Sequence, residues 1–583
     1  MKRGDVTFTT AADWRGIVLK IALLFAFVYA TNAGFTERFE LLWGVHRYTT
    51  LVPWLIIWGM SLGAIVIAAF QPSRLVRLFW AVVLSLSTAL GTGYAMASGS
   101  DMSIFDVLIL WNARHESGRA LDFYYHDALW ALVVFAIGLV LLMLPPSLPH
   151  GWLRRLVKWF GWTPVVPVAV IASIVFTKNG GGSEVIPRQF QTLALGVVAG
   201  TKLATNHVAR RHEVQIAPAN QPAARNIVLL VGESVRGDYI DWKPGNPYTP
   251  QMAALRDRFV DFGPASSGGN CSNTSNAILR LGGTRHHLTR SVNTNPTIWQ
   301  YAKRAGYHTV YIDGQSGFIK NPGKMQNYMT MAEAADIDEF VTFDSSIPTP
   351  QLDFRVLKET EKRLHGKQPV FIYANKEGAH FPYDEGYPAS ATIFKPTVAS
   401  TGVESGPNRV DSYRNVVRWS VDGFFRRLFD EVDLKHTAII YTSDHGQNLI
   451  EGRFTHCSME NPDPREGLVP LLAITGDPAL KARFEKGAAL NRGHASHFAI
   501  TPTLLELFGY APGDVLKHHD ASLFERDTAS TAFAAGDIFG LFRDKPLWTK
   551  VDLSTNYKEA YSDPKPTTSD LAANASPVPQ PVN

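Results

Sequence analysis

The chain has 583 residues, of which 46% are hydrophobic and 19% are charged. This length exceeds that of one typical domain severalfold, so we expect at least two folding units, each large enough to bury a core. The net charge of +4 is small for such a chain and gives no support to nucleic-acid binding, so no nucleic-acid partner is expected.

The first third of the chain contains five apolar stretches. Each is long enough to cross a bilayer as a helix, which takes about 20 mainly apolar residues. The first stretch precedes four others and is followed by no convincing small-residue cleavage site, so we interpret it as a retained anchor. The stretches lie near residues 16–34, 50–71, 77–97, 127–146 and 159–177. The sequence therefore predicts a five-span transmembrane domain over residues 1–178.

Basic residues in the short loops predict the orientation of these spans. Lys and Arg are retained on the cytoplasmic side of a membrane. They precede span one and lie in the loops between spans two and three and between spans four and five: Lys2, Arg3, Arg15, Arg74, Arg77, Arg154, Arg155 and Lys158. All of these segments fall on one side, and the number of spans is odd. The remainder of the chain is therefore expected outside the cytoplasm.

Residues 179–225 are polar and rich in Pro and Ala toward their end, which we interpret as a linker along the membrane surface. The pattern then changes to short apolar runs separated by helix-like segments, which is typical of a parallel or mixed sheet covered by helices. The clearest runs are 227–231, 309–312, 370–373, 438–441 and 469–474, and helical spacing covers 297–306, 411–430 and 500–508. We expect an α/β domain over residues 226–566 and a disordered, Pro/Ala/Ser/Thr-rich tail over 567–583.

Four of the apolar runs are followed at once by side chains that can bind a metal or a phosphate. Taken singly, Gly-Glu-Ser is usually a turn with a solvated carboxylate, and His380 alone is more often structural. The carboxyl ends of parallel strands meet at one edge of a sheet, so the joint placement predicts a single site. The groups are Glu233 and Ser234, Asp313 to Ser316, Asn375 with Glu377 and His380, and Ser443 to Gly446.

The Gly/Ser/Asn-rich segment 266–280 lies between the first of these runs and a helix-like stretch. Most segments of this composition are flexible loops that end in a helix N-cap. The functional interpretation requires a hydroxyl at a helix N-terminus, where backbone N–H groups favour an anion. A metal beside that hydroxyl would make it a nucleophile.

The order Gly-Glu-Ser, Thr in a polar loop, Gly-x-His-x-Pro and Ser-Asp-His-Gly resembles the membrane phosphoethanolamine transferases of the alkaline phosphatase/sulfatase superfamily. Lipoteichoic acid synthase and the phosphoglycerol transferases are similar. The resemblance implies an alkaline-phosphatase-like domain with a central mixed, mainly parallel sheet between helices. It also implies one or two metal ions, zinc or alternatively manganese or magnesium.

Residue by residue, the resemblance assigns Glu233, Thr274, Asp444 and His445 to the metal shell and makes Thr274 the carrier of the transferred group. The family register that counts from the preceding Cys would select Ser275 instead. His380 and His456 match histidines that contact the phosphoryl group or a second metal. Asp313, Gln315 and Lys320 match a substrate wall.

The implied reaction transfers phosphoethanolamine from a phospholipid, such as phosphatidylethanolamine, to an envelope glycan or glycolipid through a phospho-threonine. The implied protein is a monomer embedded in the bacterial inner membrane, with its catalytic domain in the periplasm. Phosphoglycerol transfer and hydrolysis by a phosphodiesterase are the alternatives. A sulfatase needs a Cys or Ser in a Cys/Ser-x-Pro/Ala-x-Arg motif, and the residues that follow Cys271 do not supply it. Family members that act on lipid A often carry several disulfides. This chain has two cysteines in all, which weakens the case for lipid A as the acceptor.

Those two cysteines flank the assigned residues. Cys271 stands three residues before Thr274, and Cys457 directly follows His456. If both assignments hold, the two loops converge on one metal site and the thiols come near bonding distance. An oxidising compartment favours a disulfide, whereas two cysteines near one metal can stay reduced, and the sequence leaves both states open.

Overall fold

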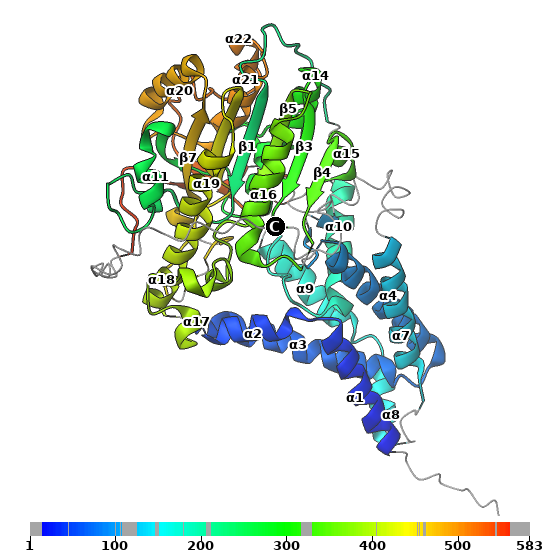
Figure 1. Cartoon of the computed structure of the whole chain (residues 1–583). Helices are drawn as coiled ribbons and strands as arrows, with labels where there is room; N and C mark the ends of the chain where they lie inside the picture. Colours follow the sequence, from blue (N-terminus) through cyan, green and yellow to red (C-terminus); the bar gives the residue numbers. More distant parts are fainter. Residues whose placement is uncertain are drawn as a thin grey trace, which may run out of the picture. The chain divides into compact units, whose positions relative to one another are not determined.

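The computed structural model forms two compact units, residues 1–111 with 117–205 and residues 112–116 with 206–583 (Figure 1). It describes residues 14–44, 46–98, 101–104, 106–107, 125–145, 151–178, 180–205, 211–315, 329–344, 346–403, 405–451, 453, 455–458, 462–540, 542 and 545–559. The expected disordered tail, 567–583, lies outside these ranges.

The first unit is helical. In chain order its helices include α1 (Trp14–Ala30), α2 (Gly34–Gly44), α3 (Tyr48–Ala69), α4 (Arg74–Ser98), α7 (Tyr125–Met143), α8 (Trp152–Trp159), α9 (Val165–Thr177) and α10 (Arg188–Thr205). Among the described residues, α3 and α4 are long and apolar enough to cross a membrane. The pair α1 and α2, bent by 75°, adds a third span if it is counted as one. The predicted count of five is not confirmed, because α9 has only 13 residues and the apolar part of α7 begins at Ala128.

Helix α10 lies within the stretch 179–225 that the sequence analysis interprets as a linker. It packs against α4 and α9 and belongs to the first unit. Its buried side chains include Phe190, Ala194, Leu195 and Val198, which have helical spacing. Interspersed Gln, Thr, Gly and Lys residues lower its hydropathy, which is why a search for apolar stretches passes over it.

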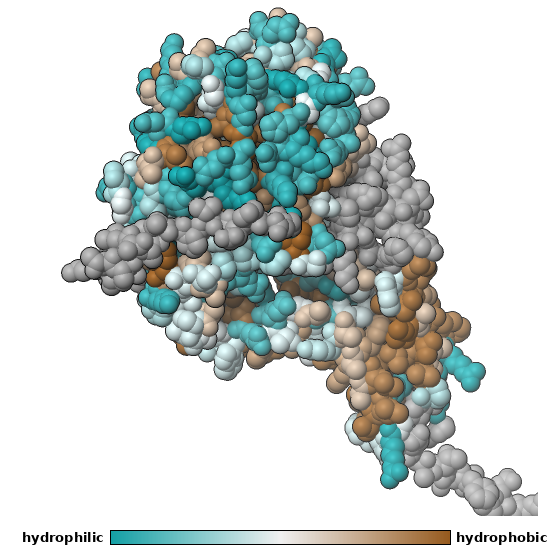
Figure 2. Space-filling model, viewed as in Figure 1, coloured by the Kyte–Doolittle hydropathy of each residue, from teal (hydrophilic) through white to brown (hydrophobic). Residues whose placement is uncertain are grey.

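The outer surface of the first unit is apolar, and Figure 2 shows these side chains in brown. Exposed large hydrophobic residues include Val18, Leu19, Ile56, Leu75, Leu132 and Val140. Exposure on this scale is unusual for a protein in water and is typical of contact with hydrocarbon. The membrane character predicted for this part of the chain is therefore supported by its surface as well as by its helices.

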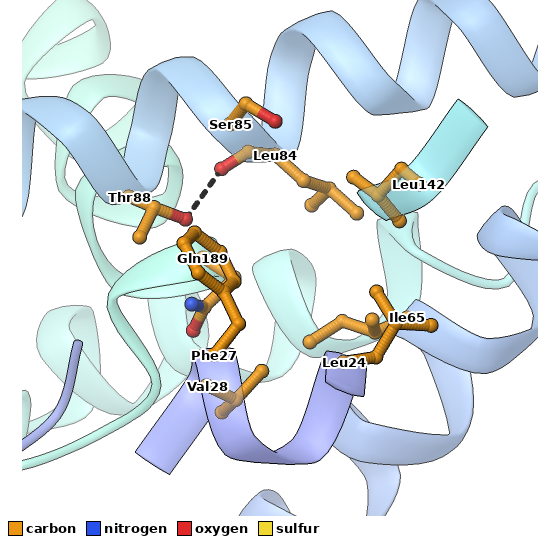
Figure 3. A pocket seen from close by; sticks show the side chains of 9 residues that line it. All are labelled: Leu24, Phe27, Val28, Ile65, Leu84, Ser85, Thr88, Leu142 and Gln189. Carbon is orange, nitrogen blue, oxygen red and sulfur yellow. Dashed lines mark hydrogen bonds between the residues drawn. The ribbon is translucent and has the colours of Figure 1, made fainter. Parts of the chain in front are cut away.

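The interior of the first unit contains one buried lysine and a small cavity. Lys20 donates hydrogen bonds from Nζ to the carbonyl oxygens of Ala69 (2.8 Å) and Leu144 (2.6 Å), which satisfies groups at the ends of α3 and α7. The cavity, drawn in Figure 3, has apolar walls with three polar side chains. It is lined by Leu24, Phe27, Val28, Ile65, Leu84, Ser85, Thr88, Leu142 and Gln189. Thr88 is satisfied within its own helix by the carbonyl of Leu84 (2.7 Å).

The second unit is built on a seven-stranded sheet in the order β2-β7-β6-β1-β5-β3-β4. The strands are β1 (Asn226–Gly232), β2 (Val260–Ser266), β3 (His308–Asp313), β4 (Glu339–Thr342), β5 (Val370–Asn375), β6 (Thr437–Ser443) and β7 (Leu468–Thr475). Strands β6, β1, β5, β3 and β4 are parallel, whereas β7 is antiparallel to β6 and β2. The predicted mixed, mainly parallel sheet is thus confirmed.

Helices cover both faces of this sheet (Figure 1). Side chains alternate along β1, so that Ile227 and Leu229 belong to one core cluster and Val228 and Leu230 to another. The first cluster includes residues of α14 (Ile298–Arg304), α20 (Pro478–Asn491) and α21 (Ile500–Leu507). The second includes residues of α16 (Thr349–Leu364), α18 (Gly406–Val417) and α19 (Phe424–Glu431). Burial on both faces explains why the strands read as continuous apolar runs.

All five predicted runs are strands, and the three predicted helical segments are helical. The segment 411–430 contains α18, a π-helical turn over Arg418–Gly423, and α19. Two strands of the sheet were not predicted. Strand β2 contains Gly263 and Pro264, where its pairing with β7 shifts register, and β4 is a half-buried edge strand of four residues. A separate hairpin pairs β8 (Ala532–Ala535) with β9 (Leu547–Lys550).

Candidate active site

Three side chains that the sequence assigned to a metal shell meet at one edge of the sheet. Glu233 directly follows β1, and Asp444 and His445 directly follow β6. The register pairs Gly232 with Ser443, so both strands end at the same level. One ligand atom from each residue lies within 4.8 Å of the others. The Nε2 atom of His445 is 3.3 Å from Glu233 Oε1 and 3.6 Å from Asp444 Oδ2.

The three side chains of the triad are coupled electrostatically. Burial and the neighbouring Glu233 carboxylate raise the pKa of Asp444 well above its usual range. Burial lowers the pKa of His445, but the carboxylates of Asp444 and Glu233 outweigh it and raise that pKa to about 9. The buried Oδ2 of Asp444 has no hydrogen-bond partner in the structure. The triad therefore holds protons in the space that a cation would take, and binding of a cation would release them.

The donor set fits a divalent metal ion. The Nδ1 atom of His445 lies 2.8 Å from the carbonyl oxygen of Gly446, which can only accept, so Nδ1 carries the proton. Nε2, which faces the two carboxylates, is then the nitrogen that would release its proton and offer its lone pair to a cation. Two carboxylates and one imidazole with a fixed tautomer are a common ligand set for zinc and manganese.

Backbone contacts hold the triad in place. Asp444 Oδ1 accepts from the amides of Ser234 (3.0 Å) and His445 (2.7 Å). Gly378, with φ at +59°, packs so closely that a Cβ there would lie 2.5 Å from the backbone nitrogen and oxygen of Glu233. Only glycine fits such an approach, which explains the Gly of the Gly-Ala-His segment after β5.

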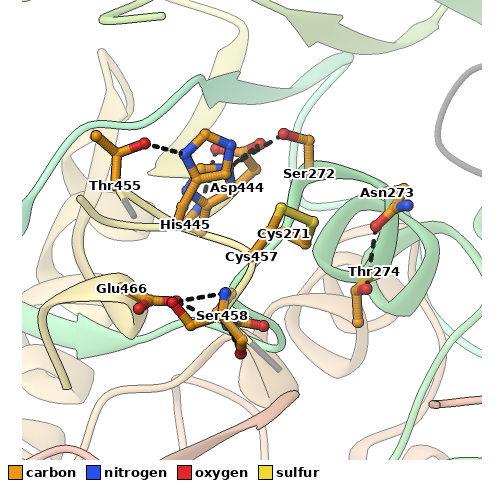
Figure 4. The surroundings of a disulfide bond; sticks show 12 residues. Cys271, Ser272, Asn273, Thr274, Asp444, His445, Thr455, Cys457, Ser458 and Glu466 are labelled. Carbon is orange, nitrogen blue, oxygen red and sulfur yellow. Dashed lines mark hydrogen bonds and ion pairs between the residues drawn. A yellow bond between two sulfur atoms is a disulfide. The ribbon is translucent and has the colours of Figure 1, made fainter. Parts of the chain in front are cut away.

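The hydroxyl beside the triad belongs to Ser272, which the sequence analysis did not select. Ser272 is the first residue of α12 (Ser272–Arg280). Its Oγ donates to Glu233 Oε2 at 3.1 Å and lies 3.1 Å from His445 Nε2, as Figure 4 shows for the histidine. The position of Ser272 could have indicated this role, because it is the first polar residue after the Cys271 N-cap.

The two hydroxyls that the sequence did select lie elsewhere. Thr274 is 4% exposed, and its Oγ1 donates to Asn273 Oδ1 at 3.1 Å, away from the triad (Figure 4). Ser275 is fully buried, with its Oγ 3.2 Å from His497 Nδ1. The structure therefore brings Glu233, Asp444 and His445 together but does not place Thr274 with them. One helical residue spans about 100°, so a shift of two positions turns the side chain to the opposite face of α12.

The two cysteines form a disulfide, with 4.7 Å between their Cα atoms (Figure 4). The amide of Cys457 also donates to the carbonyl of Asn270 at 2.8 Å, and the Asn270 side chain donates to the carbonyl of Ser458 at 2.9 Å. The loop before α12 is thus tied to the loop that carries His456. Of the two states that the sequence left open, the structure adopts the bonded one.

The two assigned histidines lie beside the triad. The ring of His456 stacks on that of His445 with 4.4 Å between centroids, and its Nδ1 is 3.2 Å from Gln447 Oε1. Burial, reinforced by the charge of His445, lowers the pKa of His456 to about 3. His380 is exposed, and its charge acts on the pKa values of both Glu233 and His456. Both imidazoles therefore border the same space.

Two residues of the predicted substrate wall, Asp313 and Gln315, lie beside the triad in the structure. Gln315 donates from Nε2 to Glu233 Oε2 at 2.8 Å, which positions a ligand of the triad. Asp313 is fully buried and accepts from the amide of Gln315 at 3.0 Å, so it supports the loop that carries Gln315. Burial raises the pKa of Asp313 to about 7. Lys320 lies outside the described residues.

A segment near the end of the described chain also reaches the loop after β1. Arg236 is fully buried and pairs with Asp238 (2.5 Å) and with Glu559 (2.6 Å). Its Nη1 also contacts the carbonyl of Gln447, the residue whose side chain meets His456. No sequence motif indicated this contact, because its partners are 323 residues apart.

Residues 225–510 match the family model described as Sulfatase. The chain is 24% identical over 306 residues to the Kdo(2)-lipid A phosphoethanolamine 7''-transferase of Escherichia coli (strain K12), covering 49% of this chain and 52% of that protein. It is 22% identical over 303 residues to phosphoethanolamine transferase EptA of the same strain, covering 50% and 54%. The chain thus spans about half the length of the curated relatives it matches.

Among solved structures, the integral membrane protein lipooligosaccharide phosphoethanolamine transferase A (EptA) from Neisseria meningitidis aligns with 17% identity and a TM-score of 0.48. That alignment covers 87% of this chain and 98% of the other. The resemblance drawn from the motifs is confirmed by the family match and the curated relatives. Residues 225–510, which hold the triad and both disulfide cysteines, form a sulfatase-family domain.

Proposed function

We propose that this protein is a phosphoethanolamine transferase that moves the head group of a phospholipid, phosphatidylethanolamine, onto an envelope glycan or glycolipid. The observation that carries the proposal is the buried Glu233, Asp444 and His445 triad with a helix-N-terminal hydroxyl in contact with it. The curated relatives named phosphoethanolamine transferases support the choice of head group.

The triad would hold one divalent cation, zinc or alternatively manganese or magnesium. When bound, such a cation supplies positive charge beside the phosphoryl oxygens and favours the ionised hydroxyl. The chemistry then requires residues that orient the hydroxyl and move protons. Glu233 Oε2 accepts the hydrogen bond that orients the hydroxyl, and the same oxygen accepts a second hydrogen bond from Gln315.

The reaction proceeds in two displacements. The α12 hydroxyl passes its proton to Glu233 and its oxygen bonds to phosphorus, the bond from phosphorus to the diacylglycerol oxygen breaks, and a histidine protonates that oxygen. An acceptor hydroxyl then gives up its proton to the histidine and its oxygen bonds to phosphorus, the bond from phosphorus to the α12 oxygen breaks, and that oxygen takes its proton back from Glu233. His380 is the histidine for both transfers, since it is exposed and borders the triad, whereas His456, with its pKa lowered to about 3, is neutral and serves to orient the phosphoryl group. Stacking on His445 fixes the plane of the His456 ring.

We place this site on the periplasmic side of a bacterial inner membrane, in a monomer anchored by five spans. Three observations support a membrane anchor: the distribution of basic residues, the apolar helices α3 and α4, and the apolar surface of the first unit (Figure 2). Residues 226–566 are the proposed catalytic region. An anchored site explains how both donor and acceptor can be lipids.

The acceptor is an envelope glycan or glycolipid, and lipid A belongs to that class. The first curated relative is named for Kdo(2)-lipid A, which supports lipid A here. The single disulfide argues the other way, because the sequence resemblance associates lipid A with several. Phosphoglycerol transfer and hydrolysis remain the alternative reactions, and the products separate them.

The test uses purified full-length protein in lipid nanodiscs with phosphatidylethanolamine labelled in ethanolamine. We expect diacylglycerol and a labelled acceptor, loss of both products with a chelator, and recovery with zinc. Asp444→Asn should abolish the reaction, and Asp257→Asn, the same change at an exposed site, should not. Labelled phosphoethanolamine released into water with no labelled acceptor would identify a hydrolase. Preference for phosphatidylglycerol would identify a phosphoglycerol transferase.

A further inference from the structure

We propose that Ser272, and not Thr274 or Ser275, is the residue that carries the transferred group as a phosphoserine ester. This inference rests on the proposed transfer reaction and specifies its covalent step. Three hydroxyls lie within four residues at the start of α12, and the structure gives each a different environment. Only one of these environments suits a nucleophile.

Ser272 is the hydroxyl that contacts the triad. Its Oγ is 3.1 Å from both Glu233 Oε2 and His445 Nε2, so it touches two of the three metal ligands. It is partly exposed, as a group that meets a substrate must be. It is also the first residue of a nine-residue helix, where unpaired backbone N–H groups favour a phosphoryl group.

Thr274 and Ser275 are each engaged elsewhere. The Thr274 hydroxyl donates to Asn273, and the side chain is 4% exposed. Ser275 is fully buried and contacts His497, whose other ring nitrogen lies 2.9 Å from Thr442 Oγ1. Burial lowers the pKa of His497 to about 3, so this imidazole stays neutral and links two hydroxyls in the core. A phosphoryl ester on either residue would have to displace packed protein.

The disulfide supports Ser272 in a way that it cannot support the others. Cys271 directly precedes Ser272, and Cys457 directly follows His456. A bond between these neighbours fixes the backbone on both sides of the space between the hydroxyl and the histidine. Thr274 and Ser275 lie further along α12, so their positions are fixed by the helix and not by the disulfide.

The covalent step balances on these atoms. Ser272 Oγ forms a bond to the phosphorus of phosphatidylethanolamine, and its proton leaves along the hydrogen bond to Glu233. The bond from phosphorus to the diacylglycerol oxygen breaks, and that oxygen takes a proton from His380. The acceptor hydroxyl later gives its proton to His380 and bonds to phosphorus, the bond from phosphorus to Ser272 Oγ breaks, and Glu233 returns its proton to the serine.

The experiment traps the adduct in full-length protein. Wild type is mixed with vesicles of ethanolamine-labelled phosphatidylethanolamine, quenched in acid and digested, and the peptide that spans residues 272–275 is fragmented by mass spectrometry. We expect the phosphoethanolamine adduct on Ser272. Ser272→Ala should lose the adduct and at least about three orders of magnitude of transfer while keeping its metal content. Ser272→Thr should restore an adduct at position 272.

Thr274→Val is the competing variant, and Ser390→Ala, at an exposed site, controls for the substitution itself. An adduct on residue 272 in Thr274→Val supports the proposal. An adduct on Thr274 or Ser275 in wild type overturns it and leaves the transfer reaction intact. Diacylglycerol release with no adduct on any residue overturns the covalent step alone. Neither diacylglycerol nor adduct in metal-loaded wild type overturns the proposed function itself.

Discussion

Removing the disulfide should destabilise the second unit measurably. The change is the double variant Cys271→Ser/Cys457→Ser, which leaves no unpaired thiol. The bond joins residues separated by 186 positions, and the loop-entropy relation gives about 5 kcal/mol for a loop of that length. The hydrogen bonds from Cys457 to Asn270 and from Asn270 to Ser458 cross the same two loops and survive the substitution. The loss of stability therefore arises mainly in the unfolded state, because the unfolded chain gains conformational entropy when the bond is absent.

The assay is thermal unfolding of detergent-purified full-length protein at a fixed heating rate, with and without reductant. Each kcal/mol corresponds to a shift of about 2 °C for a unit of this size, so we expect a decrease in Tm on the order of 10 °C. Reduced wild type should match the variant, and reductant should not shift the variant further. Equal Tm values for oxidised wild type and variant would refute the reasoning. So would two freely alkylated thiols in unreduced wild type.

Three further predictions address other contacts. Asp444→Asn should lower bound metal by at least about tenfold in elemental analysis, with Asp257→Asn unchanged, since a charged ligand is lost. Glu559→Gln should lower stability by about 1–3 kcal/mol in denaturant unfolding, because Arg236 is fully buried and keeps only Asp238 as an ionic partner. A shift below the scatter of replicate unfolding curves would contradict this. Lys20→Met should reduce the yield of folded protein from membranes, because the carbonyls at the ends of α3 and α7 lose their hydrogen-bond donor. An unchanged yield and Tm would show that these carbonyls find another donor.

Much of the fold could be predicted because the central strands are buried on both faces. Strands β1, β5 and β6 therefore appear as unbroken apolar runs, whereas the short edge strand β4 and the Gly-Pro interruption in β2 weaken the same signal. The triad was predictable for a related reason. Glu233 and Asp444 directly follow strands whose ends a parallel sheet aligns.

The hydroxyl was harder to predict, because its identity depends on where α12 begins. A family spacing counted along the chain gives Thr274 or Ser275, but a helix turns each successive side chain through about 100°. Only the position of the first helical residue decides which hydroxyl meets Glu233. The pairing of Arg236 with Glu559 had no local signal at all, since sequence pattern carries little information across 323 residues.

That same pairing has a consequence for biosynthesis. Arg236 lies in the loop that follows the first strand of the second unit, yet the buried carboxylate that pairs with it is among the last described residues. During synthesis from the N-terminus, the guanidinium must wait for almost the whole unit before Glu559 emerges. The residues of the triad are all made before then. A nascent chain thus acquires every residue of the triad while the loop beside Glu233 still lacks its ionic partner, so this loop reaches its final contacts only after Glu559 has been made.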